Sequence, residues 1–321
     1  MASHSSTSSF SEQKIFFKKL LIFIVLVIVV DQALGRLLEH VFYNLRTGRF
    51  GVINLAVDTR ADILVLGDSK AHHNYKPIVI ENNLGLTCFN LGADGMNVIY
   101  HYILINHIIN YYKPKLIIYD VSGKEFNEKY FDPSKFSILM PYAKNCRNAL
   151  DIIIKEDSFI HIKLLSRLYP FNQNLHSLIF HGVVAPRISK GFEPLYGTNL
   201  AKESKIKKDE TSSKIKENDI LKFTFKALLD IAAEHKIPMV LINSPVWDFD
   251  DYYRLYNFPQ NILNMLKGYA VELSIIQKDK YPQLNEEQLF KDSSHLNNQG
   301  AFIFSNIVNS YLHQLKSANY F

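Results

Sequence analysis

The stretch that decides the fold is ADILVLGDSK, residues 61–70. Its core, Ile63-Leu64-Val65-Leu66, is apolar without interruption, as in a short parallel strand that is buried on both faces. Gly67 permits a sharp turn directly after this run, and Ser69 follows the turn. The stretch therefore predicts a buried strand that ends in a turn carrying a serine.

Downstream, short apolar runs alternate with segments whose apolar residues recur at helical spacing. The runs predict further strands at residues 87–91, 116–119, 238–243 and 271–276. The helical segments are residues 77–83, 97–112, 220–235, 259–269 and 298–315. Strands and helices that alternate in this way form crossover units. We therefore expect a three-layer α/β/α domain of flavodoxin-like type, with a mostly parallel sheet, over residues 61–321.

One long segment, at about residues 124–219, breaks this alternation. It contains helix candidates at residues 149–168, a loop-like part at 181–198 and the start of a polar stretch at 202–222. The polar stretch mixes its lysines with Asp and Glu, which is typical of a solvated linker. We expect the segment to be an insertion or a cap over the sheet.

The N-terminal residues have the pattern of a membrane anchor. Residues 1–15 predict a flexible tail, residues 16–40 a transmembrane signal anchor and residues 41–60 a connector. The unbroken apolar run, residues 20–30, is short for a full span, but helical periodicity continues to about residue 40. Lys18 and Lys19 precede the run and favour a cytoplasmic N-terminus with an exported domain, whereas Arg36 on the far side opposes it. A cleaved signal peptide and a buried core helix are the alternatives.

Composition excludes several other classes of protein. Hydrophobic residues make up 47% of the chain and charged residues 21%, which predicts a sizeable folded core. The net charge of +5 comes without a dense basic face or a nucleic-acid-reading module, so we expect no nucleic-acid partner. The two cysteines, Cys88 and Cys146, are not at zinc spacing, and a disulfide between them stays open. We expect no cofactor.

A second chemical signal is Asp292-Ser293-Ser294-His295, just before the last predicted helix. A serine must lose its proton to attack, so it needs a base, and the base needs an orienting acceptor. Asp292 can accept from Nδ1–H of His295, which leaves Nε2 to face Ser69. The alternative is that Asp292 caps a turn and His295 is an ordinary surface residue.

A third signal is Asn90-Leu91-Gly92-Ala93-Asp94-Gly95, at the end of the second predicted strand. Gly92 can present its N–H to an oxyanion without a side chain in the way, and the N–H of Ser69 can be a second donor. An ordinary strand-to-helix turn is the alternative.

Together these blocks resemble the SGNH/GDSL hydrolase superfamily, over residues 61–315 without the insertion. Ser69 matches its first block, Gly92 the second, and Asp292 with His295 the last. The resemblance implies a serine esterase or acyltransferase. Members usually have Gly-x-Asn-Asp after the third strand, and its Asn completes the oxyanion hole. Here residues 119–125 read YDVSGKE, with no such Asn. The side chains that can substitute for it are Ser122, Asn90, Asn97 and Asn127.

The missing block and the anchor resemble exported SGNH proteins that modify cell-envelope polymers, including alginate acetylation proteins and the teichoic-acid D-alanylation protein DltD. That resemblance implies acyl, above all acetyl, esters of an envelope polysaccharide as substrates. It also implies a membrane-bound O-acyltransferase as a partner and a single-pass location with the main domain outside.

Several other residues invite a functional interpretation. Lys70, His72 and His73 follow Ser69 and are expected to line its turn and touch substrate; lacking Asp or Cys at ligand spacing, they predict no metal. Trp247 and three nearby tyrosines can stack on a sugar or pack the loop, and we favour packing. The tyrosines are Tyr252, Tyr253 and Tyr256.

Two rival functions remain. A degenerate SGNH domain that serves as a binding or scaffold subunit is favoured by the missing Asn and opposed by the intact Ser, Asp and His. A nucleotide-binding α/β protein is disfavoured because no phosphate loop follows the first strand.

Overall fold

The computed structural model describes residues 6–82, 84–132, 139–143, 157–173, 175, 189–200, 216–247, 258–277 and 280–321. Half of the predicted insertion lies outside these ranges. Cys146, Tyr252, Tyr253 and Tyr256 also lie outside the described residues.

The core of the domain is a five-stranded sheet in the order β2-β1-β3-β4-β5, and every pairing is parallel. Its strands are β1 (Ile63–Gly67), β2 (Cys88–Asn90), β3 (Leu116–Asp120), β4 (Met239–Asn243) and β5 (Val271–Ile275). Each coincides with a predicted strand to within a residue or two. The predicted α/β fold with a mostly parallel sheet is therefore confirmed, and its strand order is that of flavodoxin-like folds.

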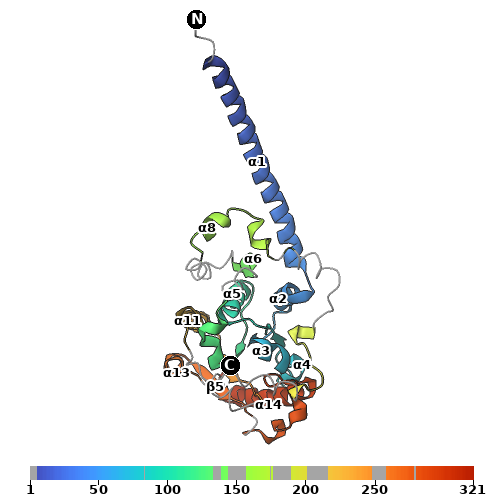
Figure 1. Cartoon of the computed structure of the whole chain (residues 1–321). Coiled ribbons are helices and arrows are strands. Elements are labelled where there is room, and N and C mark those ends of the chain that lie inside the picture. The colour runs from blue at the N-terminus through green and yellow to red at the C-terminus, as the bar shows by residue number, and fades with distance from the viewer. Residues whose placement is uncertain are drawn as a thin grey trace.

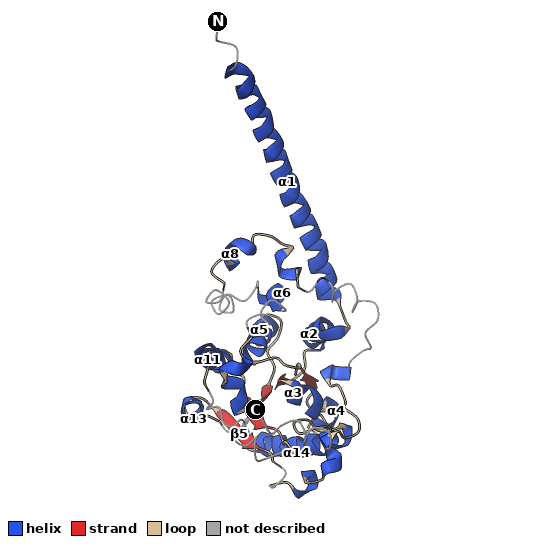
Figure 2. Cartoon of the chain, viewed as in Figure 1, coloured by secondary structure: helices blue, strands red, loops and turns tan. Residues whose placement is uncertain are grey.

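Helices cover both faces of the sheet (Figure 2). One face carries α2 (Gly48–Thr59), α5 (Val98–Ile109), α11 (Asp219–Glu234) and α13 (Gln260–Leu266). The other carries α3 (Ser69–Asn74), α4 (Pro77–Ile80) and α14 (Asn298–Ser317). The short α3 was not predicted, because its sequence SKAHHN carries no amphipathic pattern.

The shorter helical segments lie between these elements. They are η1 (Gly123–Phe126), η2 (Glu128–Tyr130), α6 (Met140–Ala143), α8 (Ile160–Lys163), η4 (Tyr169–Phe171), η5 (Ser189–Gly191), η6 (Pro282–Leu284) and η7 (Glu287–Leu289).

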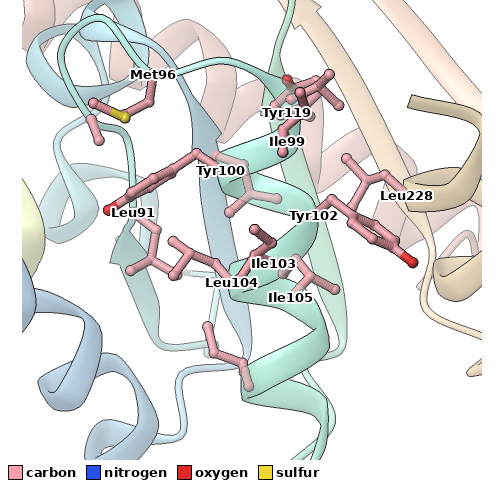
Figure 3. Packing of buried hydrophobic residues seen from close by; sticks show 14 of the residues in the cluster. Leu91, Met96, Ile99, Tyr100, Tyr102, Ile103, Leu104, Ile105, Tyr119 and Leu228 are labelled. Atoms are coloured by element: carbon pink, nitrogen blue, oxygen red, sulfur yellow. The ribbon is translucent and has the colours of Figure 1, made fainter. Parts of the chain in front are cut away.

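The central strands divide their side chains between two hydrophobic cores. On β1, Leu64 and Leu66 enter the core beneath α5, whereas Ile63 and Val65 enter the core beneath α14. Successive strand residues point to opposite faces, so a strand that is buried on both sides must be apolar throughout. Figure 3 shows the first core, where Tyr100 and Leu104 of α5 pack near Leu91 and Tyr102 lies toward Leu228 of α11.

Asparagine side chains set where three long helices of the domain begin. Asn97, Asn218 and Asn297 each accept hydrogen bonds from backbone N–H groups of the first turn of α5, α11 and α14. Such caps satisfy donors that have no partner within the helix. The predicted start at residue 97 is therefore the cap itself, and the helix proper begins one residue later.

The N-terminal helix α1 (Ser6–Asn44) projects away from the domain (Figure 1). Among the described residues it is the one helix that is long and apolar enough to cross a membrane. Its apolar residues at 20–30 are exposed, which contradicts the buried-core-helix alternative. The helix begins at Ser6, within the segment predicted to be a flexible tail.

The predicted connector at residues 41–60 contains a structural element of the domain. Within it, α2 buries Phe50, Ile53 and Ala56 in the core beneath α5. These residues recur at the three-residue spacing of one helix face. The domain therefore begins before residue 61, and an N-terminal truncation at that point would remove part of its core.

Two histidines of α5 are buried. Burial lowers the pKa of His101 to about 3 and the pKa of His107 to about 4. The unfolded chain takes up protons on these groups near pH 6.5, whereas the folded chain does so only well below pH 5. Stability is therefore lost as the pH falls through the window from 6.5 to about 4.

We predict that His107→Phe flattens this pH dependence. Each buried histidine costs the wild type about 2 kcal/mol of unfolding free energy between pH 7 and pH 5, and the variant keeps only the cost from His101. Urea unfolding of the detergent-solubilised chain at both pH values measures the difference. His313→Gln, on the partly exposed face of α14, is the control. Equal pH dependence in His107→Phe and wild type would contradict the prediction.

Candidate active site

Chemical groups gather where the order of the strands reverses. β1 pairs with β2 on one side and with β3 on the other, and the chain leaves β1 directly into Ser69 of α3. In open parallel sheets this switch point, at the carboxyl ends of the strands, is where ligands bind. Ser69 therefore occupies the place expected for a reactive group.

Ser69, His295 and Asp292 form one chain of hydrogen bonds. His295 Nε2 lies 2.7 Å from Ser69 Oγ, and His295 Nδ1 lies 2.8 Å and 2.9 Å from the two carboxylate oxygens of Asp292. A carboxylate can only accept, so Nδ1 carries the proton and Nε2 presents its lone pair to the serine hydroxyl. This is the arrangement of a serine nucleophile, its general base and an orienting acid. The predicted contacts are present; the catalytic roles stay predictions.

The turn at residues 292–295 is held rigidly around the carboxylate. Asp292 Oδ1 accepts from the backbone N–H groups of Ser294 and His295, at 2.8 Å and 2.9 Å. Burial alone would raise the pKa of Asp292, but the hydrogen bond from His295 and these two N–H groups lower it overall. Asp292 therefore caps the turn, as one alternative predicted, and is at the same time the hydrogen-bond partner of His295.

Asn74, at the end of α3, ties this turn to the nucleophile helix. Its Oδ1 accepts from the Leu296 N–H at 3.1 Å, and its backbone oxygen accepts from the Ser305 hydroxyl on α14. The side chain is fully buried, so the contact fixes how far His295 stands from Ser69. The sequence did not reveal this residue, because its partners Leu296 and Ser305 are more than 200 positions away.

The first turn of α3 is fixed from below. Gly67 adopts φ +137°, and a Cβ there would lie 2.7 Å from the Asp120 carbonyl oxygen, so only glycine fits. Asp68 caps α3 by accepting from the Lys70 N–H at 2.8 Å. The Lys70 ammonium lies 3.4 Å from Asp120 Oδ1, and both side chains are buried. Lys70 therefore anchors α3 to β3 and does not line the site, contrary to the prediction.

Gly92 and Asn90 have different roles from those predicted. The Gly92 N–H donates to Asn90 Oδ1 at 2.8 Å, so in this structure it does not face an oxyanion. Asn90 is fully buried and donates its amide to the backbone oxygens of Ala71 and Tyr75, at 2.7 Å and 2.9 Å. Asn90 therefore braces α3 against the end of β2 and is not exposed to a substrate.

The other candidates for the missing asparagine are also structural. Asn97 caps α5 and Asn127 caps η2, each through its side-chain oxygen. Ser122 is buried at the start of η1. Just before it, the Tyr119 hydroxyl donates to Glu125 across the same turn. Ser69 is the first residue of α3, and its backbone N–H has no acceptor among the described residues.

His72 and His73 do have a carboxylate partner, which the sequence did not reveal. Asp94 Oδ1 lies 2.8 Å from His72 Nδ1 and 3.2 Å from His73 Nε2. Asp94 follows β2 while the histidines follow β1, and parallel pairing brings the two strand ends together. Burial lowers the pKa of His73, but Asp94 and the Glu193 carbonyl raise it overall. The expectation of no metal rested on the lack of an Asp or Cys at ligand spacing in the sequence. Asp94 shows that this argument is wrong.

Trp247 packs within the loop that follows β4. Its ring centroid lies 5.4 Å from that of Phe290, and its backbone N–H donates to the Ser293 oxygen at 2.9 Å. Loop packing, the favoured interpretation, is thus what the described part of this loop shows. Trp247 supports the turn that carries Asp292 and His295.

Comparisons with known proteins add no family assignment. No family model and no curated protein matches the chain. A solved structure of a protein assigned to the G-D-S-L lipolytic family, from Desulfitobacterium hafniense DCB-2, aligns with TM-score 0.40 and 10% identity, covering 77% of this chain and 97% of its own. A structure described as a platelet activating factor from Streptococcus pneumonia aligns with TM-score 0.38 and 12% identity, over 88% and 99%. At these TM-scores the fold rests on this chain's own strand order.

We predict that Gly92→Ala displaces the nucleophile helix. The new Cβ would lie 2.3 Å from the His72 nitrogen and 2.7 Å from the Ala71 carbonyl carbon, which are backbone atoms that cannot swing aside. Overpacking of this kind costs about 1–3 kcal/mol of unfolding free energy. Urea unfolding should show that loss, together with lower reactivity of Ser69. Gly268→Ala, where a Cβ meets only one atom at 3.6 Å, is the control and should be nearly neutral.

Proposed function

We propose that this chain is a membrane-anchored serine esterase or O-acyltransferase of the SGNH/GDSL type. The observation that carries the proposal is the 2.7 Å contact between His295 Nε2 and Ser69 Oγ, with Asp292 behind the imidazole. A serine hydroxyl is a weak nucleophile until a positioned base removes its proton. Groups from opposite ends of the sequence meet here in that geometry, at the ligand-binding edge of the sheet.

In the proposed mechanism, Ser69 Oγ attacks the carbonyl carbon of an ester while His295 Nε2 takes the hydroxyl proton. The tetrahedral intermediate collapses, the ester C–O bond breaks, and His295 returns the proton to the leaving alkoxide. Water or a sugar hydroxyl then attacks the acyl-enzyme, again deprotonated by His295, and releases Ser69. Asp292 holds the ring and stabilises the imidazolium in both steps.

The oxyanion would be stabilised mainly by the Ser69 N–H at the start of α3. With Gly92 donating to Asn90, the site has fewer donors than a complete oxyanion hole. Each missing donor typically costs about a hundredfold or more in rate. We therefore expect slow hydrolysis of simple esters, which is compatible with an enzyme whose natural acceptor is not water.

The envelope part of the proposal rests on α1. Its long apolar stretch follows Lys18 and Lys19, an arrangement that favours a cytoplasmic N-terminus and an exported domain. A domain tethered there would act on acetyl or other acyl groups of a cell-envelope polysaccharide, beside a membrane-bound O-acyltransferase that supplies or receives them. Nothing in the contacts themselves selects the acyl group.

A second candidate is a catalytically weak binding or scaffold subunit. The specific observation that favours it is the Gly92 N–H, which is committed to Asn90. The formed contacts among Ser69, His295 and Asp292 oppose it, because a pure scaffold does not require an oriented imidazole on a serine.

We predict that the detergent-solubilised chain reacts with a fluorophosphonate probe and slowly hydrolyses p-nitrophenyl acetate. Ser69→Ala should abolish labelling, since the probe bonds to that oxygen. His295→Gln should reduce the labelling rate by at least about 10²-fold, because the base contributes roughly 10²–10⁴.

Ser310→Ala, on an exposed part of α14, should label like wild type and shows that the probe is selective. If the folded wild-type chain is not labelled, the enzyme proposal is contradicted and the scaffold subunit becomes the better-supported function. Labelling that persists in Ser69→Ala would instead place the nucleophile elsewhere.

A further inference from the structure

Three potential metal ligands converge beside the Ser69–His295 pair. His72 Nδ1, His73 Nε2 and a carboxylate oxygen of Asp94 all lie within 4.8 Å of one another. His73 is buried, His72 is partly buried and Asp94 is exposed, so the cluster is open to solvent on one side. The ring centroids of His73 and His295 are 5.8 Å apart, which places the cluster on the flank of the proposed general base.

Glu193 orients the imidazole of His73 through a hydrogen bond and lies near that of His72. His73 Nδ1 lies 2.8 Å from the Glu193 backbone oxygen, which can only accept, so Nδ1 carries a proton. His72 Nε2 faces the Glu193 carboxylate at 3.7 Å. Histidines that bind metals almost always donate their second ring N–H to a carbonyl or a carboxylate in this way.

Asp94 Oδ1 can only accept, so His72 Nδ1, 2.8 Å away, carries a proton in the metal-free chain, and a divalent metal would replace that proton at the point where the three groups converge. Three electron-pair donors facing one point repel each other unless a proton or a cation lies between them. The two N–O separations, 2.8 Å and 3.2 Å, are near the ligand–ligand spacing of about 3.4 Å in a tetrahedral zinc site. The third separation, between His72 Nδ1 and His73 Nε2, is at most 4.8 Å and would have to match the same spacing.

We propose that His72, His73 and Asp94 form a binding site for a divalent transition metal of the zinc class. Two imidazoles and one carboxylate are a donor set that suits Zn²⁺ and Co²⁺. The site is separate from Ser69 and from the hydrogen bonds among Ser69, His295 and Asp292. Metal binding and the proposed ester chemistry can therefore be tested independently.

The test is titration of the metal-stripped, detergent-solubilised chain with Zn²⁺ by calorimetry and with Co²⁺ by visible absorption. We expect one equivalent to bind. Asp94→Asn and His72→Gln should each weaken binding by at least about tenfold, since even indirect supports of a metal contribute 10–100-fold. His313→Gln, Ser69→Ala and His295→Gln should bind like wild type.

No stoichiometric binding by wild type would overturn the site and would show that protons alone bridge these groups. Binding that survives Asp94→Asn but is lost in His295→Gln would also overturn it, by placing the metal on the proposed base. Asp94 is exposed, so its variant is expected to fold, and urea unfolding checks this.

A separate observation concerns where the domain meets the membrane. The apolar run of α1 at residues 20–30 spans about 16 Å at 1.5 Å per residue, roughly half of a bilayer's hydrocarbon core. Beyond it, Leu34, Leu37 and Val41 remain exposed along one face of α1. Gln32 and Glu39 lie on the opposite face, and Asp31 lies beside Leu34, three positions along the helix.

Those polar residues are covered by the segment that follows α8. Asp31 accepts from the Ser166 hydroxyl at 2.5 Å and from the Arg167 N–H at 2.9 Å. The Arg167 guanidinium donates to Gln32 Oε1 at 2.8 Å and to Glu39 at 3.0 Å. A Cβ on Gly35 would lie 2.3 Å from Arg167 Cβ, so the two segments touch.

The outer side of this segment is apolar. Phe159, Ile162 and Leu165 are 64%, 66% and 76% exposed, although each is a large hydrophobic residue. Figure 1 shows α8 at the end of the domain nearest to the projecting part of α1. Exposed apolar residues of this kind, next to an apolar helix, mark a lipid-facing surface.

We infer that residues 159–168 lie in the interface of the same bilayer that α1 crosses, so that the apolar face of α1 and these three side chains share one lipid boundary. The inference rests on α1 being a membrane helix, which is part of the proposed function.

Single-tryptophan variants in a Trp247→Phe background, reconstituted into vesicles with brominated acyl chains, test this. We expect strong quenching of Val27→Trp and Leu165→Trp, and little of Phe302→Trp, an exposed position on α14. If Val27→Trp is quenched but Leu165→Trp behaves like Phe302→Trp, the interface inference fails while the anchor stands. If Val27→Trp is not quenched, the anchor itself fails.

Discussion

The structure depends on the burial of β1 between two other parallel strands and two helical layers. Because β1 pairs with β2 and β3, its backbone groups are satisfied along both edges, and its side chains fill both cores. At the end of β1, Gly67 adopts φ +137°, and a Cβ there would lie 2.7 Å from the Asp120 carbonyl oxygen, so only glycine fits. The chain must turn there, and the turn delivers Ser69 to the open edge of the sheet.

The second half of the site reaches that edge from the far end of the sequence. The turn at residues 292–295 is closed by the short antiparallel bridge between Phe290 and Leu296 and is then fixed to α3 by Asn74. Beneath α3, Lys70 and Asp120 form a buried ion pair. Breaking such a pair costs about 3–5 kcal/mol, because the remaining charge stays buried. Helix α3 is thus held both by the turn that carries His295 and by β3 below it.

Two strand ends also explain why the histidines after Ser69 are not isolated. Parallel pairing of β1 with β2 places Asp94 beside His72 and His73. Glu193 reaches the same place from η5, whose Gly191 packs so closely on the end of β2 that a Cβ there would lie 1.7 Å from the Asn90 backbone oxygen. The polar cluster and the Ser69–His295 pair share one rim of the sheet. Groups that would bind an ion or a charged substrate therefore flank the groups that would perform acyl transfer.

The sequence by itself determined the fold class, the five strands and most of the helices, because apolar periodicity records which faces must leave water. It also singled out Ser69, Asp292 and His295, since a nucleophile, a base and an acid leave recognisable residue types at strand ends. It misjudged α2 as a connector and could not reveal α3, because neither short helix carries a clear amphipathic pattern in its sequence.

Only the tertiary structure decided which groups have partners. Gly92 and Lys70 carried plausible roles in sequence, but the Gly92 N–H donates to Asn90 and the Lys70 ammonium lies beside Asp120. The contacts of Asp94 with two histidines, of Asn74 with Leu296 and of Asp31 with Ser166 join residues separated by 21 to 222 positions. A hydrogen bond depends on the distance and direction between two groups in space, and the number of residues between them in the sequence determines neither.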